Sequence, residues 1–252
     1  MSDLTGKTAV VVGASRGLGR GITRALAGAG ARVVAVARNG PDLAELAAAS
    51  ANIRTEVADA AEESVAWSVL DQYAPDVLIL VAGASPVMRP LQHQTWETFS
   101  VNWQADVKIA FGWLREALLQ PLRPGSTVVV MSSGAAINGS PASGGYAGAK
   151  ATQRFIAEYA RDESRRAGLG ITVTAVLPRM TPAGAVGQRG IRAYAARGGQ
   201  TEQEYLAPLG DLLTAERAGS ALVDLVRGDP ARVASGYLLT AAGLQELPSG
   251  PG

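Results

Sequence analysis

The sequence predicts an α/β protein built on a doubly wound parallel sheet of about seven strands, and three observations support this fold class. Short β-branched runs alternate along the 252 residues with Ala- and Leu-rich stretches of helical period. The runs TAVVV, DVLILV and STVVVM are apolar on both faces, which is typical of a parallel sheet covered by helices on each side. A glycine-rich turn, GASRGLG, joins the first strand to the first helix. Together these features indicate the Rossmann fold.

The elements are expected to alternate in order along the chain. Short β-branched runs define the strands, and apolar residues repeating every three or four positions define the helices. The strands are expected at residues 8–12, 32–37, 53–57, 77–81, 127–131, 171–176 and 237–239, and the helices at 18–29, 42–49, 61–72, 96–119, 146–167 and 215–226.

Residues 1–252 are interpreted as one domain, because no linker, internal repeat or charge block divides them. Residues 178–210 interrupt the alternation with Pro, Gly and charged residues. A connection that follows a late strand overhangs the carboxyl edge of such a sheet, so this segment is predicted to be a flap over a substrate. Its arginines, Arg189, Arg192 and Arg197, are interpreted as a solvated helical face rather than as receptors for an anionic substrate.

The composition excludes several classes of function. Lys and Arg total 23 against 22 Asp and Glu, a formal net charge of +1, so no nucleic-acid or membrane partner is expected. The absence of cysteine excludes disulfides and Cys-ligated metal centres, and the single histidine, His93, excludes His-rich metal sites, so no metal site is expected. His93 is interpreted as a surface or rim residue. No basic segment followed by a long apolar run opens the sequence, so we expect a soluble cytoplasmic protein.

The first turn has the spacing G-x-x-x-G-x-G. Glycines allow a tight turn and a close approach of backbone to ligand, and the helix that follows directs free N–H groups at a pyrophosphate. Many such turns use glycine for geometry alone, but the position after a first strand favours dinucleotide binding. The residues expected to form this site are Gly13, Ser15, Arg16, Gly17, Leu18 and Gly19. No G-x-x-x-x-G-K-[ST] motif is present, which disfavours a nucleoside triphosphate.

The end of the second strand favours NADP over NAD. An acidic residue there would bind the adenosine ribose and repel a 2′-phosphate, but the strand ends at Ala37-Arg38. Arg38 and Arg16 could converge on a phosphate, which suits the guanidinium group. The alternative is two solvated loop arginines in an arginine-rich chain.

A serine, a tyrosine and a lysine form the candidate catalytic set. Ser133 follows a strand at the carboxyl edge of the sheet, where ligands bind. Tyr146 and Lys150 are four positions apart at the start of a helix, so their side chains share one face, within about 6 Å at Cβ. An ammonium beside a phenol lowers its pKa from about 10, which makes tyrosine a usable proton donor. Alone, such a pair would be an ordinary amphipathic pair; Ser133 and the glycine turn favour catalysis.

The combined motifs resemble the short-chain dehydrogenases/reductases, in the branch of about this length that includes 3-oxoacyl reductases. The resemblance covers nearly the whole chain and rests on the turn at 13–19, Ser133, Tyr146-x-x-x-Lys150, Asn102 in SVN, and SGYLLTAAG near the C-terminus. It implies that Ser133 binds the substrate carbonyl, Tyr146 donates the proton and Lys150 holds the nicotinamide ribose. Asn102 would hold a water that links Lys150 to solvent.

The resemblance extends the expected cofactor site. Asp59 would contact the adenine, and Ala82 and Gly83 would line the cofactor. The complete predicted set is Gly13, Ser15, Arg16, Gly17, Leu18, Gly19, Arg38, Asp59, Ala82, Gly83, Tyr146, Lys150 and Pro178. The chain departs from the family at Val81, where an asparagine is usual, and at Arg179, where a glycine usually follows the proline. Valine could brace the sheet by packing, and Arg179 is interpreted as pointing to solvent.

These expectations combine into an NADPH-dependent carbonyl reductase or alcohol dehydrogenase acting on a ketone or secondary alcohol. Two alternatives stay open: a catalytically idle NADP-sensing interaction protein, and a dehydratase or epimerase on the same scaffold. By resemblance, the helix containing Asn102 and the helix beginning at Tyr146 pack against a second copy, giving a homodimer or homotetramer. Trp96, Trp103 and Trp113 are expected to form core or subunit contacts.

Overall fold

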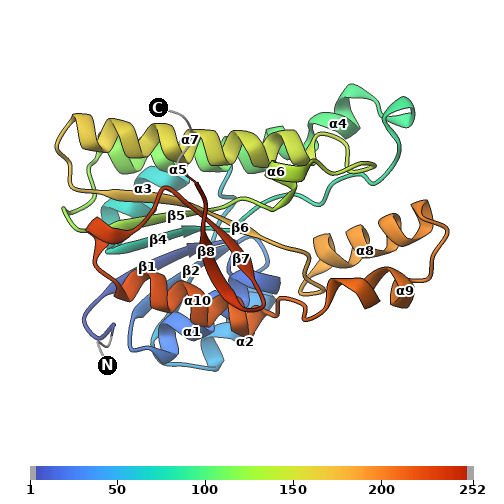
Figure 1. Ribbon diagram of the computed structural model, residues 1–252. Helices are drawn as coiled ribbons and strands as arrows, with labels where there is room; N and C mark the ends of the chain where they lie inside the picture. Colours follow the sequence, from blue (N-terminus) through green and yellow to red (C-terminus); the bar gives the residue numbers. More distant parts are fainter. Residues whose placement is uncertain (1–3, 249–252) are drawn as a thin grey trace.

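A single eight-stranded sheet runs through the computed structural model, which describes residues 4–248 (Figure 1). In the described part the strand order is β3-β2-β1-β4-β5-β6-β7-β8. All neighbours are parallel except β8, which runs antiparallel to β7. The strands are β1 Thr8–Val12, β2 Arg32–Ala37, β3 Ile53–Val57, β4 Val77–Leu80, β5 Thr127–Met131, β6 Thr172–Pro178, β7 Gly236–Thr240 and β8 Gly243–Glu246.

Helices cover both faces of this sheet, with α1, α2 and α10 on one side and α3, α5 and α7 on the other (Figure 1). The helices are α1 Gly17–Gly28, α2 Gly40–Ala48, α3 Glu63–Tyr73, α4 Trp96–Asn102, α5 Lys108–Leu119, α6 Ala135–Asn138, α7 Tyr146–Arg166, α8 Ala185–Arg197, α9 Glu202–Leu206 and α10 Ala215–Arg227. A π-helical turn, Trp103–Val107, joins α4 to α5.

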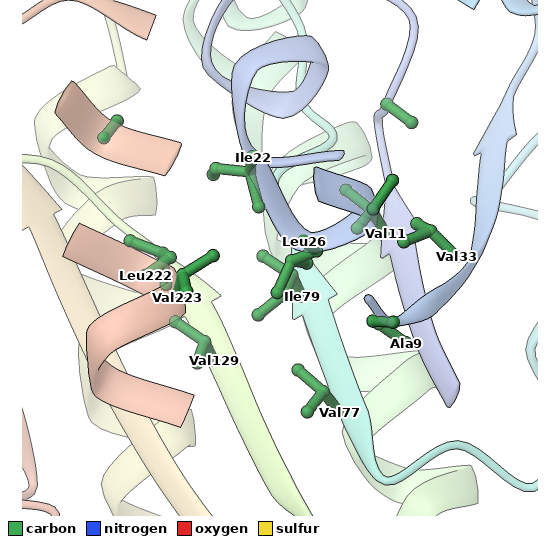
Figure 2. Close-up of a cluster of buried hydrophobic side chains, with 14 of the residues drawn as sticks. Ala9, Val11, Ile22, Leu26, Val33, Val77, Ile79, Val129, Leu222 and Val223 are labelled. Carbon is green, nitrogen blue, oxygen red and sulfur yellow. The ribbon is translucent and has the colours of Figure 1, made fainter. Parts of the chain in front are cut away.

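The core lies in two apolar layers, one on each side of the sheet. Every residue of β1, β4 and β5 is buried, which explains why these strands are apolar on both faces. Figure 2 shows one layer, where Ile22 and Leu26 of α1 and Leu222 of α10 pack over the central strands. Full burial of such a side chain contributes roughly 1.5–3 kcal/mol.

The strand order reverses between β1 and β4, because the chain builds outward in one direction through β2 and β3 and in the other through β5 and β6. In open α/β sheets, ligands bind in the crevice outside the carboxyl ends of the strands at such a point. The helices α4, α8 and α9 extend beyond this same end of the sheet (Figure 1). The fold therefore places its cleft where the glycine turn after β1 and the residues after β4 and β5 meet.

The predicted fold class is confirmed, and four details differ from expectation. The segment 96–119 is not one regular helix, since the π-helical turn interrupts it after Asn102. The flap at 178–210 contains α8 and α9, and the short helix α6 lies in a segment expected to be a loop. The eighth strand, Gly243–Glu246, was not expected; it returns along β7 after a tight turn and has only four residues. Among the described residues, no helix combines the length and apolarity needed to cross a membrane.

Candidate active site

A cleft of about 1710 Å³ opens at the carboxyl ends of the strands. Its lining comes from distant parts of the sequence: the turn after β1, the ends of β2 and β4, the segment after β5, the start of α7 and the flap. Of the predicted site residues, these line it: Gly13, Ser15, Arg16, Gly17, Leu18, Gly19, Arg38, Asp59, Ala82, Gly83, Ser133, Tyr146, Lys150 and Pro178. Asn102 does not line it and lies buried behind the wall.

The glycine turn is shaped for close backbone approach. Gly13 has a φ of +95°, and a Cβ there would lie 2.5 Å from the backbone nitrogen of Ala82. A Cβ on Gly19 would lie 2.1 Å from the carbonyl oxygen of Gly13, so only glycine lets α1 pack this closely on the turn. Within residues 4–248, the side chain of the N-cap residue Arg16 makes no capping hydrogen bond to α1, and the first turn of this helix holds no acidic residue. Its positive end is thus free for an anion, and the turn fits a dinucleotide pyrophosphate.

Two of the predicted cofactor residues contact each other across the cleft mouth. The Nη1 atom of Arg38 lies 3.7 Å from Oδ2 of Asp59, and both side chains are substantially exposed. An exposed pair of this kind contributes at most about 1 kcal/mol to stability, because water screens it. Arg38 is therefore available to a stronger anionic partner, and Arg16 is exposed on the same cleft.

The three candidate catalytic side chains converge on the cleft from β5 and α7. Ser133 lies two residues beyond β5, where its Oγ accepts a hydrogen bond from the backbone N–H of Ala135 at 3.2 Å. Tyr146 is the first residue of α7, and its ring centroid is 5.5 Å from Nζ of Lys150. Ser132 fastens the strand to this helix, since its buried hydroxyl donates to the carbonyl of Lys150 at 2.7 Å. Ser133 and Tyr146 are half-buried, whereas Lys150 is buried.

Lys150 is held by three acceptors. Its Nζ lies 3.0 Å from Oδ2 of Asp106 and donates to Oε1 of Gln153 at 2.8 Å and to the carbonyl of Met131 at 3.3 Å. Burial lowers the pKa of Lys150, but the negative charges of Asp106 and of Tyr146 when ionised raise it, and the net effect holds the pKa above its ordinary value. The lysine is thus an ammonium over the whole neutral range.

Asp106 and Gln153 are the residues that sequence reasoning missed. The carboxylate of Asp106 also accepts from the Nδ2 atom of Asn102 at 3.2 Å and from the backbone N–H of Ala84 at 2.8 Å. Asn102 in turn donates to the carbonyl of Ala84 at 2.8 Å, while its Oδ1 is buried without a partner among the described residues. A signal existed: Asp106 falls four positions after Asn102 and three before the buried Ile109, on the apolar face of the helical pattern.

The two departures from the family pattern are accommodated differently. Val81 lines the cleft and packs against the hydrophobic core, so it braces the sheet through apolar contact as expected. Arg179 is exposed at the cleft wall, and its backbone N–H donates to the carbonyl of Leu239 at 2.9 Å.

The remaining candidates lie largely at the surface. His93 is exposed, as are Arg189, Arg192 and Arg197, of which only Arg197 lines the cleft. The three tryptophans divide between core and surface, because Trp113 is buried and donates to the carbonyl of Ala60 at 3.0 Å, while Trp96 and Trp103 are exposed.

Three features define the Rossmann class of dinucleotide-binding proteins: a parallel sheet whose strand order reverses at its centre, a glycine-rich turn after the first strand, and a cleft at the carboxyl ends of the strands. The sequence pattern of one family of this class, described as short chain dehydrogenase, matches residues 7–191. The chain therefore belongs to the short chain dehydrogenase family, whose members are oxidoreductases that use a nicotinamide cofactor.

Curated relatives agree with this assignment. L-xylulose reductase of Bos taurus is 35% identical over 111 residues, which cover 42% of this chain and 46% of that protein. A hydroxynaphthalene reductase-like protein of Metarhizium majus is 30% identical over 187 residues, 70% of this chain and 68% of that protein. D-erythrulose reductase of Gallus gallus is 31% identical over 131 residues, 50% and 53% of the two chains. The chain spans about half the length of the first and third of these relatives.

Proposed function

We propose that this protein is an NADPH-dependent reductase of a ketone, or in reverse a dehydrogenase of a secondary alcohol, with Tyr146 as proton donor and acceptor. The observation that carries the proposal is the convergence of Ser133, Tyr146 and Lys150 on the cleft that the glycine turn opens onto. A hydroxyl pair beside an ammonium suits a reaction that builds negative charge on a carbonyl oxygen.

Each side chain has a separate role in the proposed reaction. When bound, the nicotinamide supplies the hydride, and the protein aligns the carbonyl with it. The Ser133 hydroxyl binds the carbonyl oxygen, and the phenol of Tyr146 gives its proton to that oxygen as charge develops. Lys150 holds the nicotinamide ribose and stabilises the phenolate that Tyr146 becomes, because its positive charge lies beside the ring.

The preference for NADP rests on charge at the adenosine end of the cleft. Arg38 ends β2 where an acidic residue would select NAD, and Arg16 is exposed on the same cleft. A 2′-phosphate is a stronger partner for Arg38 than the exposed carboxylate of Asp59, since it carries more charge and accepts the guanidinium group in a bidentate fashion.

The flap side of the cleft supports a substrate with an apolar or ring-containing body. Met180, Leu209 and the paired rings of Tyr194 and Tyr205 line it from the flap, and Met88 lines the same cleft. Apolar and aromatic walls with few polar groups favour binding of apolar surface. Among the relatives, this lining is closer to what the name hydroxynaphthalene reductase-like implies than to a sugar reductase.

Replacing Tyr146 tests the proposal directly. In NADPH oxidation with a panel of ketones, Tyr146→Phe is expected to lower kcat by about 10²–10⁴-fold, the usual contribution of a positioned proton donor. NADPH binding, measured by fluorescence, should change little. Tyr159→Phe is the matched control, because Tyr159 is exposed on the same helix. Turnover retained by Tyr146→Phe would show that another group donates the proton.

The same assay separates the two alternatives. NADPH bound with no ketone consumed would favour a sensing protein, which the departures at Val81 and Arg179 motivate. Product formed without net consumption of cofactor would favour dehydration or epimerisation.

We propose that the assembly is a homodimer or homotetramer formed through α5 and α7. Large apolar side chains on both helices are exposed, namely Phe111, Leu119, Phe155 and Tyr159. Exposed apolar side chains on two adjacent helices fit the surface of a second copy of this chain.

A further inference from the structure

Asp106 is a buried carboxylate with an unusual set of partners. Its side chain lies in the π-helical turn between α4 and α5 and is 1% exposed. Oδ1 accepts from the backbone N–H of Ala84 at 2.8 Å and from Asn102 at 3.2 Å, and Oδ2 lies 3.0 Å from Nζ of Lys150. These groups supply two N–H donors and one positive charge to the carboxylate.

Lys150 depends on this anion for its charge. An ammonium group has three protons to donate; Nζ of Lys150 donates to Gln153 and to the Met131 carbonyl, and its third close acceptor is Oδ2 of Asp106, 3.0 Å away in an ion pair. Two of these acceptors are neutral, so only Asp106 neutralises the buried charge. The titratable groups that act on Lys150 in the described structure are Asp106, from the π-helical turn, and Tyr146, from its own helix. A protonated Tyr146 offers no negative charge, which leaves Asp106 as the permanent counterion.

The surroundings fix Asp106 in this place. A Cβ on Gly83 would lie 2.7 Å from Oδ2 of Asp106. The backbone of the segment after β4, which lines the cleft, therefore packs directly against the carboxylate. On the other side, Nε2 of Gln153 donates to the backbone carbonyl of Asp106 at 2.9 Å and ties the π-helical turn to α7. Asp106 therefore connects three segments of the site: the segment after β4, the π-helical turn and α7.

We propose that Asp106 is a positioning residue for the reaction proposed above, whose carboxylate keeps Lys150 an ammonium and holds it beside Tyr146. The role of Asp106 in the reaction rests on the proposed function, whereas its effect on Lys150 does not. A ribose hydroxyl can join Lys150 when one acceptor is released, and a neutral acceptor is released more readily than the counterion.

The first test is the pH dependence of thermal unfolding of the cofactor-free protein. Without the Asp106 charge, burial dominates and the pKa of Lys150 falls below its value in the unfolded chain. Such a group destabilises the fold at low pH; the penalty declines as pH rises above the lowered pKa and vanishes above the pKa of the unfolded chain. The deficit in Tm of Asp106→Asn relative to wild type is therefore expected to shrink by at least half between about pH 7 and about pH 10. Asp162→Asn, an exposed carboxylate paired with Arg165 on α7, is the control and should show no such change.

The second test moves the charge rather than removing it. Oε1 of Gln153 is already 2.8 Å from Nζ of Lys150, so Gln153→Glu places a carboxylate beside the ammonium from the other side. Gln153→Glu also removes the hydrogen bond from Nε2 to the carbonyl of Asp106, so the double variant Asp106→Asn, Gln153→Glu is expected to recover only part of the Tm at neutral pH but to lose the pH-dependent deficit. In NADPH-dependent ketone reduction, the rate of the single variant should fall at a lower pH than that of wild type, and the double variant should restore the wild-type profile.

A Tm deficit of Asp106→Asn that stays constant with pH would overturn the inference, as would a double variant no better than the single one. If the single variant is recovered only as aggregate, the double variant decides: cooperative unfolding supports the inference, and aggregation overturns it. The unfolding measurements use no substrate, so a failure of the proposed reductase activity would leave their result intact.

Discussion

At the scale of single residues, the pair of Arg38 and Asp59 is the clearest point of specificity. The 3.7 Å contact between their side chains is exposed to water at the cleft mouth, so it costs little to separate. Asp59 was expected at the adenine and Arg38 at a 2′-phosphate, and both line the cleft. Their proximity means that a bound phosphate must compete with one carboxylate for the guanidinium group.

Arg38→Asp is therefore expected to shift cofactor preference from NADPH toward NADH. The substitution replaces attraction to a 2′-phosphate by repulsion and provides an acceptor for a ribose hydroxyl. The ratio of kcat/KM for NADPH to that for NADH should fall by about tenfold or more, which corresponds to about 1.4 kcal/mol. Arg54→Asp is the matched control, since Arg54 is exposed on β3, outside the cleft lining, and the charge change is the same. An unchanged ratio would contradict a phosphate-reading role for Arg38.

The candidate site was predictable where a short spacing fixes geometry and hidden where it depends on the tertiary fold. Tyr146 and Lys150 are four residues apart on one helix, so their proximity follows from helical period alone. Gln153 is three residues after Lys150 on the same helix, so that contact also follows from helical period, whereas Lys150 meets Asp106 only because the turn after α4 packs on α7. A polar residue in a helical segment usually faces solvent, so the position of Asp106 on the apolar face of the helical pattern does not by itself identify it as a partner of Lys150.

At the scale of elements, two contacts attach the flap to the rest of the site. Gly184, just before α8, approaches Gly17 of the dinucleotide turn, where a Cβ on Gly17 would lie 3.6 Å from the Cα of Gly184. Farther along α8, the hydroxyl of Tyr194 hydrogen-bonds that of Ser140, in the segment that leads to Tyr146. The flap thus links the cofactor turn to the catalytic helix.

Tyr194→Phe is expected to loosen this attachment without touching the reacting groups. Loss of one hydrogen bond is worth about 1 kcal/mol, so KM for the ketone should rise about fivefold while kcat stays within about twofold. Tyr205→Phe removes a hydroxyl from the other ring of the aromatic pair and serves as the control. Steady-state kinetics on both variants provide the measurement, and an equal effect of the two substitutions would count against the Ser140 contact.

Element prediction succeeded for buried strands and was poorest in the small, glycine-rich segments. The bounds of β1, β2, β3 and β5 match the expected runs. β1 and β5 are buried throughout, which selects apolar residues on both faces, whereas β3 is mostly unburied and was recognised by its β-branched residues. The π-helical turn in 96–119 was not visible, since one widened turn hardly changes the apolar period. The strand Gly243–Glu246 has only four residues and pairs through its backbone, so it carries little pattern of its own.

At the scale of the whole molecule, the exposed apolar side chains on α5 and α7 form the surface proposed for a second copy. The rings of Phe155 and Tyr159 are 6.2 Å apart on α7, and Phe111 and Leu119 are exposed on α5. The two helices lie next to each other on one face of the sheet (Figure 1).

A charge in this surface should separate the copies. Phe155→Glu, alone or with Tyr159→Glu, is expected to reduce the molar mass in light scattering after gel filtration to that of one chain, because a carboxylate cannot be buried there without a partner. Trp67→Glu, on the exposed side of α3, is the control and should leave the mass unchanged. A wild-type protein that already elutes as a single chain would refute the proposed assembly.

The two outermost strands have a consequence for solubility. An open sheet ends in unpaired backbone groups to which a strand from another molecule can add, the route by which fibrous aggregates grow. Here one boundary is β3, which carries Arg54 and Glu56, and the other is β8, which has four residues and ends at Glu246. Short length and charge at both boundaries discourage such growth, so the protein is protected against fibre formation without having to close its sheet into a barrel.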